Sequence, residues 1–201
     1  MEILTLTALI LFGAYLIKSR EQKRRVTLLA SHLGNYQIEH LMENLTEGYL
    51  RCLGENDPER REQIWSLLAT SEQTLASQFT RFAAEFSKVG AADARVSKFP
   101  IALPFAQTLF PGSSFDMREA LAIHARGIAD AAANGAQRTP KSKAFTLSAE
   151  LFLMQHTCHW FCRSKAVASA RLLARHKTSY AQVLDAVAPA TRRAYCALVG
   201  S

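Results

Sequence analysis

The first apolar stretch of the chain has nearly the length of a membrane-spanning helix. Residues 3–17 read ILTLTALILFGAYLI and contain no charged side chain. A spanning helix needs about 17–25 residues, and Met1 and the aliphatic part of Lys18 lengthen this short stretch. It lacks the basic segment that precedes the apolar core of a signal peptide and the small-residue cleavage site that follows it. We therefore predict a single transmembrane helix, rather than a signal peptide or the buried core helix of a soluble protein.

Apolar residues recur at helical spacing through most of the remaining chain. The clearest series runs from Ile64 to Val89 and follows Asp57-Pro58-Glu59, in which an N-cap residue precedes a proline at the first helical position. Further helices are expected over about residues 26–53, 113–134 and 145–174, and from 179 onward, interrupted at Pro189. The pattern predicts an all-α protein, with an N-terminal single transmembrane helix followed by a cytoplasmic helical bundle of about five helices.

This pattern divides the chain into two parts. Residues 1–25 form a transmembrane anchor with a basic flank, and residues 26–201 form the helical cytoplasmic domain. Within the domain, a polar and basic run from Gln137 to Lys143 predicts a mobile linker at residues 136–144.

Residues 95–112 break the helical pattern. They read RVSKFPIALPFAQTLFPG, in which three prolines prevent a long helix although many other positions are strongly apolar. Such a segment is covered either by the protein's own helices or by something outside the domain, which is a protein partner or the nearby bilayer surface. The candidate partner-binding residues in it are Phe99, Phe105 and Phe110.

The charge of the chain is unevenly distributed and bears on its orientation. The formal net charge is +7, and the excess lies directly after the apolar stretch and in the last third of the chain. Basic residues beside a span stay in the cytoplasm, so we expect a single-pass protein of the cell membrane (the inner membrane if bacterial), with the N-terminus outside and the domain in the cytoplasm. They are also the candidates for contact with anionic lipid. These residues are Lys18, Arg20, Lys23, Arg24 and Arg25.

One cluster has residue types that bind metals. His156, Cys158, His159 and Cys162 lie within seven residues, and imidazole nitrogens and thiolates are the usual ligands of zinc. On one helix, two or three of them could face a single ion. The alternative is an ordinary apolar helix face that includes Cys158. The cysteines form no CxxC pair, and a second ligand pair elsewhere in the chain is missing, so zinc is the weaker hypothesis.

Trp160 and Arg163 complete the candidate partner surface. Both residue types are common in binding hot spots, although a tryptophan is also a frequent core residue. No phosphate-binding glycine loop, nucleophile elbow or HExxH motif occurs, which argues against an enzyme.

Three functional hypotheses follow from these patterns. The first is a membrane-anchored helical adaptor or accessory subunit of a membrane-associated complex, acting by protein–protein contacts. The second is a small zinc-binding domain or metalloenzyme centred on residues 156–162. The third, suggested by the basic C-terminal third, is a tethered binder of anionic lipid or nucleic acid; nucleic acid is disfavoured because few aromatic residues interleave with the charge.

Overall fold

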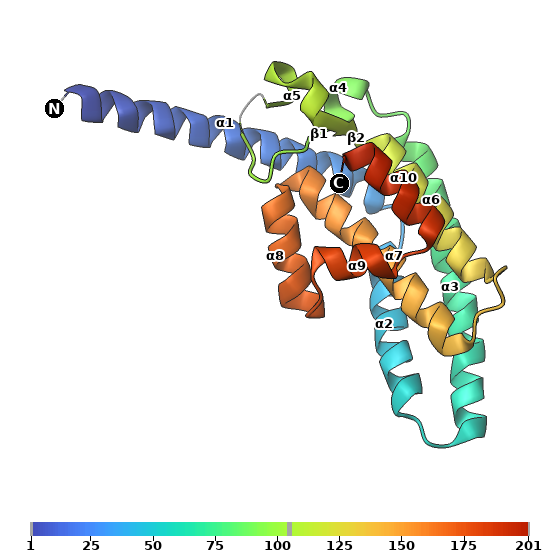
Figure 1. Ribbon diagram of the computed structural model, residues 1–201. Coiled ribbons are helices and arrows are strands. Elements are labelled where there is room, and N and C mark those ends of the chain that lie inside the picture. The colour runs from blue at the N-terminus through green and yellow to red at the C-terminus, as the bar shows by residue number, and fades with distance from the viewer. Residues whose placement is uncertain (1, 104–105, 201) are drawn as a thin grey trace.

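The protein consists of one long helix and a helical domain in the computed structural model, which describes residues 2–103 and 106–200 (Figure 1). The predicted all-α class is confirmed, apart from one small two-stranded sheet. The long helix is α1 (Glu2–Leu33). The principal helices of the domain are α2 (Ile38–Gly54), α3 (Pro58–Phe86), α6 (Met117–Ala133), α7 (Pro140–Cys162), α8 (Lys165–His176), α9 (Tyr180–Ala186) and α10 (Pro189–Val199).

Helix α1 belongs both to the projecting segment and to the domain. Its N-terminal half extends away from the other helices, whereas its C-terminal half packs on α7 and α3 (Figure 1). The boundary that the sequence suggested after residue 25 therefore falls inside a continuous helix. A turn follows α1, in which the Tyr36 amide donates to the Leu33 carbonyl at 3.0 Å. This turn separates α1 from α2, so the single helix expected over residues 26–53 was wrong.

Helix α3 is the longest helix of the domain, and it begins where the sequence indicated. The Asp57 side chain accepts a hydrogen bond from the Glu59 amide at 3.0 Å, and Pro58 occupies the first helical position. Phe79, Phe82 and Phe86 recur at intervals of three and four residues and are fully buried. They lie on the face that α3 turns toward the rest of the core, where α3 packs on α6 and α6 on α7.

Two predicted helical segments have different boundaries in the structure. The helix expected over residues 145–174 is interrupted at Arg163, because the Ser164 side chain accepts from the Val167 amide and caps a new helix, α8. At its other end, α7 starts at Pro140, so residues 140–144 of the predicted mobile linker form the first turn of a helix. These breaks, and the one at α9, give the domain more helices than the five expected.

The small sheet consists of β1 (Arg95–Ser97) and β2 (Ser114–Asp116), which pair antiparallel with Val96 opposite Phe115. Helix α6 therefore starts at Met117 and not near residue 113, and Asp116 is its N-cap. A four-residue helix, α4 (Ala91–Ala94), precedes the sheet. Between the strands lies the segment we call the apolar loop (residues 98–113), which contains α5 (Ala106–Leu109) and the 3-10 turn η1 (Pro111–Ser113).

Candidate functional site

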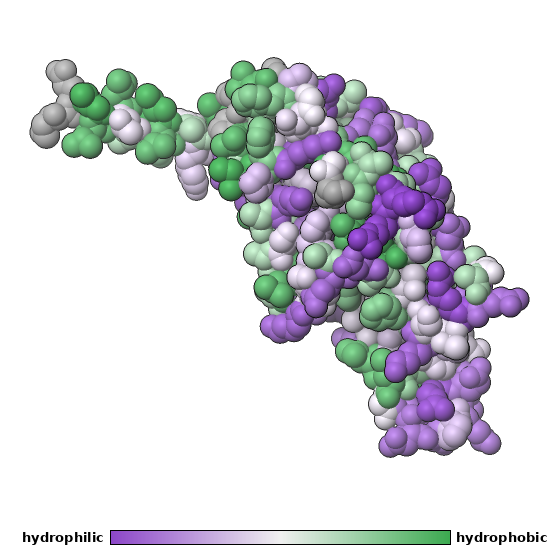
Figure 2. Space-filling model, in the orientation of Figure 1, coloured by the Kyte–Doolittle hydropathy of each residue, from purple (hydrophilic) through white to green (hydrophobic). Residues whose placement is uncertain are grey.

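The projecting half of α1 is apolar on all sides. Large side chains from Ile3 to Ile17 are exposed, and none of the most apolar part of the helix is buried in the domain. In Figure 2 this half is a mostly hydrophobic rod that projects from the domain, whose surface is a mixture of hydrophilic and hydrophobic residues. The part of α1 from residue 3 to residue 33 is long and apolar enough to cross a membrane. A helix that is hydrophobic all round needs an apolar environment, which the domain does not supply.

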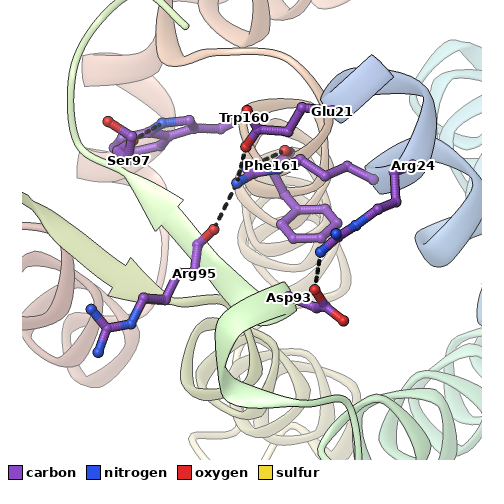
Figure 3. A network of polar contacts seen from close by, with 8 residues as sticks. Glu21, Arg24, Asp93, Arg95, Ser97, Trp160 and Phe161 are labelled. Carbon is purple, nitrogen blue, oxygen red and sulfur yellow. Dashed lines mark hydrogen bonds and ion pairs between the residues drawn. The ribbon is translucent and has the colours of Figure 1, made fainter. Parts of the chain in front are cut away.

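Arg25 fixes the other half of α1 to the domain. Its guanidinium donates to the carbonyl oxygens of Phe161 and Arg95, each at 3.0 Å, and it pairs with Glu21 one turn earlier on α1 at 3.0 Å (Figure 3). The guanidinium also lies 5.3 Å from the centre of the Phe161 ring. Phe161 is in the last turn of α7, whose carbonyl groups have no partner within the helix. Arg25 thus joins α1 to the end of α7 and to β1.

Two further contacts hold the same junction. Arg24 forms an ion pair with Asp93 of α4 (Figure 3). On the other side of α1, the Arg163 side chain donates to the Gln22 side-chain oxygen at 2.8 Å. Contacts with α4, β1, α7 and the α7–α8 turn thus set the direction in which α1 leaves the domain.

This geometry divides the five basic residues of the flank into two groups. Lys18, Arg20 and Lys23 face solvent wholly or in part, and they remain candidates for contact with anionic lipid. Arg25 was predicted to belong with them, but its side chain is largely covered by the contacts just described. Arg24 is exposed, although it is paired with Asp93.

The apolar loop lies against the same part of α1. A cleft between them is lined by Lys18 and Gln22 from α1 and by Phe99, Ile101 and Leu103 from the loop. Large apolar side chains of the loop are exposed: Ile101 (57%), Leu103 (43%), Leu109 (66%) and Phe110 (50%). The sequence left two alternatives, that the protein's own helices cover this segment or that something outside the domain does. The protein's own helices do not cover these side chains.

The candidate partner-binding residues have different positions. Phe99 and Phe110 pack edge to face, with ring centres 5.5 Å apart, and Arg163 lines the same cleft as Phe99. Trp160 is only 2% exposed, since its ring packs on Phe115 and its Nε1 donates to the Ser97 carbonyl at 2.9 Å. The Trp160 side chain therefore lies in the core and not on the surface where a partner was expected to contact it, and its role in partner binding stays a prediction. Phe105 lies outside the residues that the structure describes.

Three of the four candidate metal ligands line one pocket. Cys158, His159 and Cys162 face a largely apolar pocket of about 350 Å³ between α1, α2, α3 and α7. Burial raises the pKa of the Cys158 thiol and raises that of Cys162 to about 11, which disfavours the thiolate forms that bind zinc. Burial and the neighbouring Arg171 and Arg175 lower the pKa of His159 to about 4.

The fourth candidate ligand, His156, lies on another side of α7. Its Nε2 is 3.0 Å from the Ser169 hydroxyl of α8, and its ring stacks on Tyr180 of α9 with centres 4.5 Å apart. Among the described residues, no group of three or more histidine, cysteine, aspartate or glutamate side chains is placed to hold a metal ion. Zinc binding stays a prediction, which elemental analysis of the purified chain tests.

A buried polar network joins the helices on the far side of α7. His124 Nε2 of α6 lies 2.9 Å from the Thr157 hydroxyl of α7, which is in turn 2.9 Å from the Tyr195 hydroxyl of α10. All three side chains are fully buried, and burial lowers the pKa of His124 to about 3. Because none of them reaches solvent, this network connects helices rather than presenting groups to a substrate.

Glu150 of α7 is a second buried polar group that the sequence did not single out. One of its carboxylate oxygens accepts from the Ala188 amide at 2.9 Å, and the side chain also hydrogen-bonds Thr191. Burial outweighs these contacts and raises the pKa of Glu150 to about 7. The only sequence signal was its place in an otherwise apolar series, flanked by Leu147 and Leu151.

Comparison with protein-family models, with curated proteins and with solved structures finds no match to this chain. The functional argument therefore rests on the geometry described above.

Proposed function

We propose that this chain is a membrane-anchored helical adaptor or accessory subunit, which holds its domain at one face of a membrane and acts through protein–protein contacts. The observation that carries the proposal is the form of α1. One continuous helix has an exposed apolar half and a second half built into the domain. A membrane helix joined in this way transmits its orientation to the whole domain.

The charge beside the apolar half supports one orientation. Lys18, Arg20 and Lys23 follow the apolar stretch within two turns and are exposed or half-buried. Basic residues within about 15–20 residues of a span favour the cytoplasmic side. The proposed topology has the N-terminus outside and the domain in the cytoplasm, with α1 in the cell membrane.

The tether supports a positioning role rather than simple attachment. A flexible linker would suffice to keep a domain near a membrane. Here the chain instead continues as a helix, and Arg25 connects it to carbonyl groups of α7 and β1. Such a connection restricts the directions in which the domain can face a partner.

A second exposed apolar region supports the partner contacts. Leu50 (68% exposed) and Leu53 share one face of α2, and Leu67 is exposed on α3. The α2–α3 hairpin extends to the end of the domain opposite the projecting half of α1 (Figure 1). Exposed apolar side chains at that end are available to a protein that does not itself contact the bilayer.

The experiment that tests the anchor is alkaline carbonate extraction of membranes that contain the full chain. We expect the protein to stay in the membrane pellet. A Leu9→Arg, Ile10→Arg variant should move to the soluble fraction, since two arginines at the centre of the span oppose insertion. Release of the unchanged protein by carbonate would contradict the proposal.

Partner binding is tested by purification of the full chain from its native membranes in mild detergent. We expect a second protein in a fixed molar ratio, and we expect Leu50→Glu, Leu53→Glu to remove it. Leu173→Glu is the matched control, because Leu173 is as exposed as Leu53 but lies on α8. A chain that purifies alone and as a monomer argues against an accessory subunit.

A further inference from the structure

The apolar loop exposes large side chains that the domain does not need for its own core. Ile101, Leu103, Leu109 and Phe110 are between about two fifths and two thirds exposed. All four belong to one short segment between β1 and β2, whereas scattered single apolar residues on a surface need no explanation. Figure 2 shows hydrophobic side chains gathered on the domain beside the point where α1 leaves it.

The position of the loop along α1 identifies what covers these side chains. Ile101 and Leu103 share a cleft with Lys18 and Gln22, and the apolar stretch of α1 ends at Ile17. Residues 18–22 span about 6 Å of helix. The loop therefore lies at the level of α1 that directly follows the membrane span, which is the level of the lipid headgroups and the outermost acyl carbons.

Because the apolar stretch is short, the loop lies closer to the acyl chains of the bilayer. Residues 3–17 extend for about 22 Å at 1.5 Å per residue, whereas the hydrocarbon core of a bilayer is about 30 Å thick. A short span is accommodated by local thinning of the bilayer and by basic residues that extend their charged ends to the headgroups. Both adjustments draw Lys18 and the adjoining loop toward the acyl chains.

The loop is held in place by backbone contacts. The Lys98 amide donates to the Ser113 carbonyl at 2.9 Å and continues the β1–β2 pairing, and the Ala166 amide of α8 donates to the Pro100 carbonyl at 2.9 Å. The packing of Phe99 on Phe110 joins the two arms of the loop. The described parts of the loop, on either side of residues 104–105, are thus joined at its base, with Ile101 and Leu103 beside α1.

We propose that the apolar loop inserts into the interfacial zone of the leaflet from which α1 emerges, so that the domain rests on the bilayer at two adjacent points. Ile101, Leu103, Leu109 and Phe110 contact acyl chains and glycerol groups. Lys18, Arg20 and Lys23 contact lipid phosphates around them. The inference rests on the proposed membrane anchoring and assigns the loop to lipid, which leaves the α2–α3 hairpin for a protein partner.

The test compares two single tryptophan substitutions in the purified full chain, reconstituted in nanodiscs whose lipids carry bromine on the acyl chains. Leu109→Trp places a tryptophan in the loop, and Leu50→Trp places one on α2. The two positions are equally exposed in the protein without lipid, at 66% and 68%, so they differ only in their position relative to the bilayer. The unchanged chain supplies the signal of Trp65 and Trp160.

We expect the tryptophan introduced by Leu109→Trp to emit at shorter wavelength than the one introduced by Leu50→Trp and to be quenched several-fold more by brominated lipid. Equal and weak quenching at both positions would overturn the inference. Equal and weak quenching is also the result expected if the loop binds a protein partner in the cell instead of lipid, because the reconstituted chain contains no such partner.

The failure of this inference can be distinguished from the failure of the proposed function. If the chain stays in the membrane after carbonate extraction while the tryptophan of Leu109→Trp remains unquenched, only the lipid contact of the loop is wrong. If carbonate releases the unchanged chain, the anchor itself is wrong and the inference falls with it.

Discussion

At Gly127, α6 lies close to side chains of α7 and α10. A Cβ atom at this position would lie 2.5 Å from a carboxylate oxygen of Glu150 and 2.5 Å from the Thr191 hydroxyl oxygen. Both atoms belong to buried side chains that are held by other contacts. A side chain at position 127 would therefore push α6 away from α7 and α10.

We expect Gly127→Ala to lower the free energy of unfolding by about 1–3 kcal/mol, which is the usual cost of an overpacked core. Gly90→Ala is the control, since a Cβ there meets no atom within 4 Å, and it should change stability by less than about 0.5 kcal/mol. Thermal unfolding of both variants in detergent micelles measures the difference. Equal stability of the two would show that α6 can move without cost.

Buried histidines and Glu150 set the pH dependence of stability. His124 and His156 have pKa values of about 3 in the folded chain, and His159 one of about 4, all below the ordinary 6.5, because burial disfavours their charged forms. Burial lowers the pKa of His176 as well. Below pH 6.5 the unfolded chain therefore binds protons on these histidines that the folded chain does not bind. Glu150 has the opposite effect. Its pKa of about 7 lies above the ordinary 4.5, so the folded chain binds an extra proton between these values.

Stability should therefore be greatest near pH 6.5. Each group changes the free energy of unfolding by about 1.4 kcal/mol per pH unit within its window. Between pH 4.5 and 6.5 the histidines outweigh Glu150, and stability rises with pH. Of these groups, Glu150 alone still titrates above pH 6.5, and stability falls slightly until about pH 7. Melting temperatures between pH 4.5 and 8 measure this profile.

Glu150→Gln separates the two effects. The variant keeps an acceptor for the Ala188 amide but carries no charge, so it should be more stable than the unchanged chain at pH 8 and no more stable at pH 4.5. The same gain at both pH values would mean that the Glu150 carboxyl does not titrate as proposed.

Residue-level features that depend on long-range packing could not be predicted from the sequence. Arg25 belongs to a row of basic residues, and nothing local distinguishes the one that binds carbonyl groups of α7 and β1. Tryptophan is a residue type common in binding sites, yet the indole of Trp160 packs on Phe115 and donates to a backbone carbonyl in the core. Glu150 is buried because Ala188 and Thr191 approach it from more than thirty residues away.

At the scale of elements, a helix start was predicted correctly where several local signals agreed, whereas the break between α7 and α8 was missed. Helix α3 was located correctly because its cap, its proline and its apolar spacing all agree. The break between α7 and α8 has no proline or glycine, and only the Ser164 cap marks it. The β1–β2 pair joins residues that are about twenty positions apart, so no local pattern indicated that the apolar loop would be closed at its base.

One buried ion pair connects the α2–α3 hairpin to α7. Glu72 of α3 accepts from the Tyr49 hydroxyl at 2.6 Å and pairs with Lys143, which lies in the first turn of α7. Glu72 is almost fully buried, and Lys143 is largely so. The residue that the sequence assigned to a mobile linker thus neutralises a buried carboxylate.

We expect Lys143→Met to lower stability by about 3–5 kcal/mol, because it leaves the Glu72 charge buried without its cation. The double variant Glu72→Gln, Lys143→Met should recover most of this loss. The exposed pair of Arg192 and Asp185 is the control, and Arg192→Ala should cost less than about 1 kcal/mol. A small effect of Lys143→Met, similar to that of the control, would indicate that water replaces the cation.

At the scale of the whole molecule, the contacts at the base of α1 fix the orientation of the domain relative to that of the helix. The domain cannot turn independently of α1 while Arg25, Arg24 and Arg163 hold their partners in α7, β1, α4 and α1. On the proposed topology, the side on which the domain lies depends on the remaining cations of the flank, Lys18, Arg20 and Lys23. These three can be changed without loss of the contacts of Arg25.

We expect the triple substitution of Lys18, Arg20 and Lys23 by glutamine to reduce the fraction of chains with the domain in the cytoplasm, because positive charge near a span is what retains a flank on that side. Protease protection of the domain in sealed vesicles of known orientation measures this fraction. Triple substitution of Arg171, Arg175 and Arg192 is the matched control, since it removes the same charge far from the span. If the flank variant alone changes, the orientation is determined where α1 leaves the domain. An equal change in both variants would mean that total charge orients the chain, and no change in either would mean that charge does not; both results contradict the expectation.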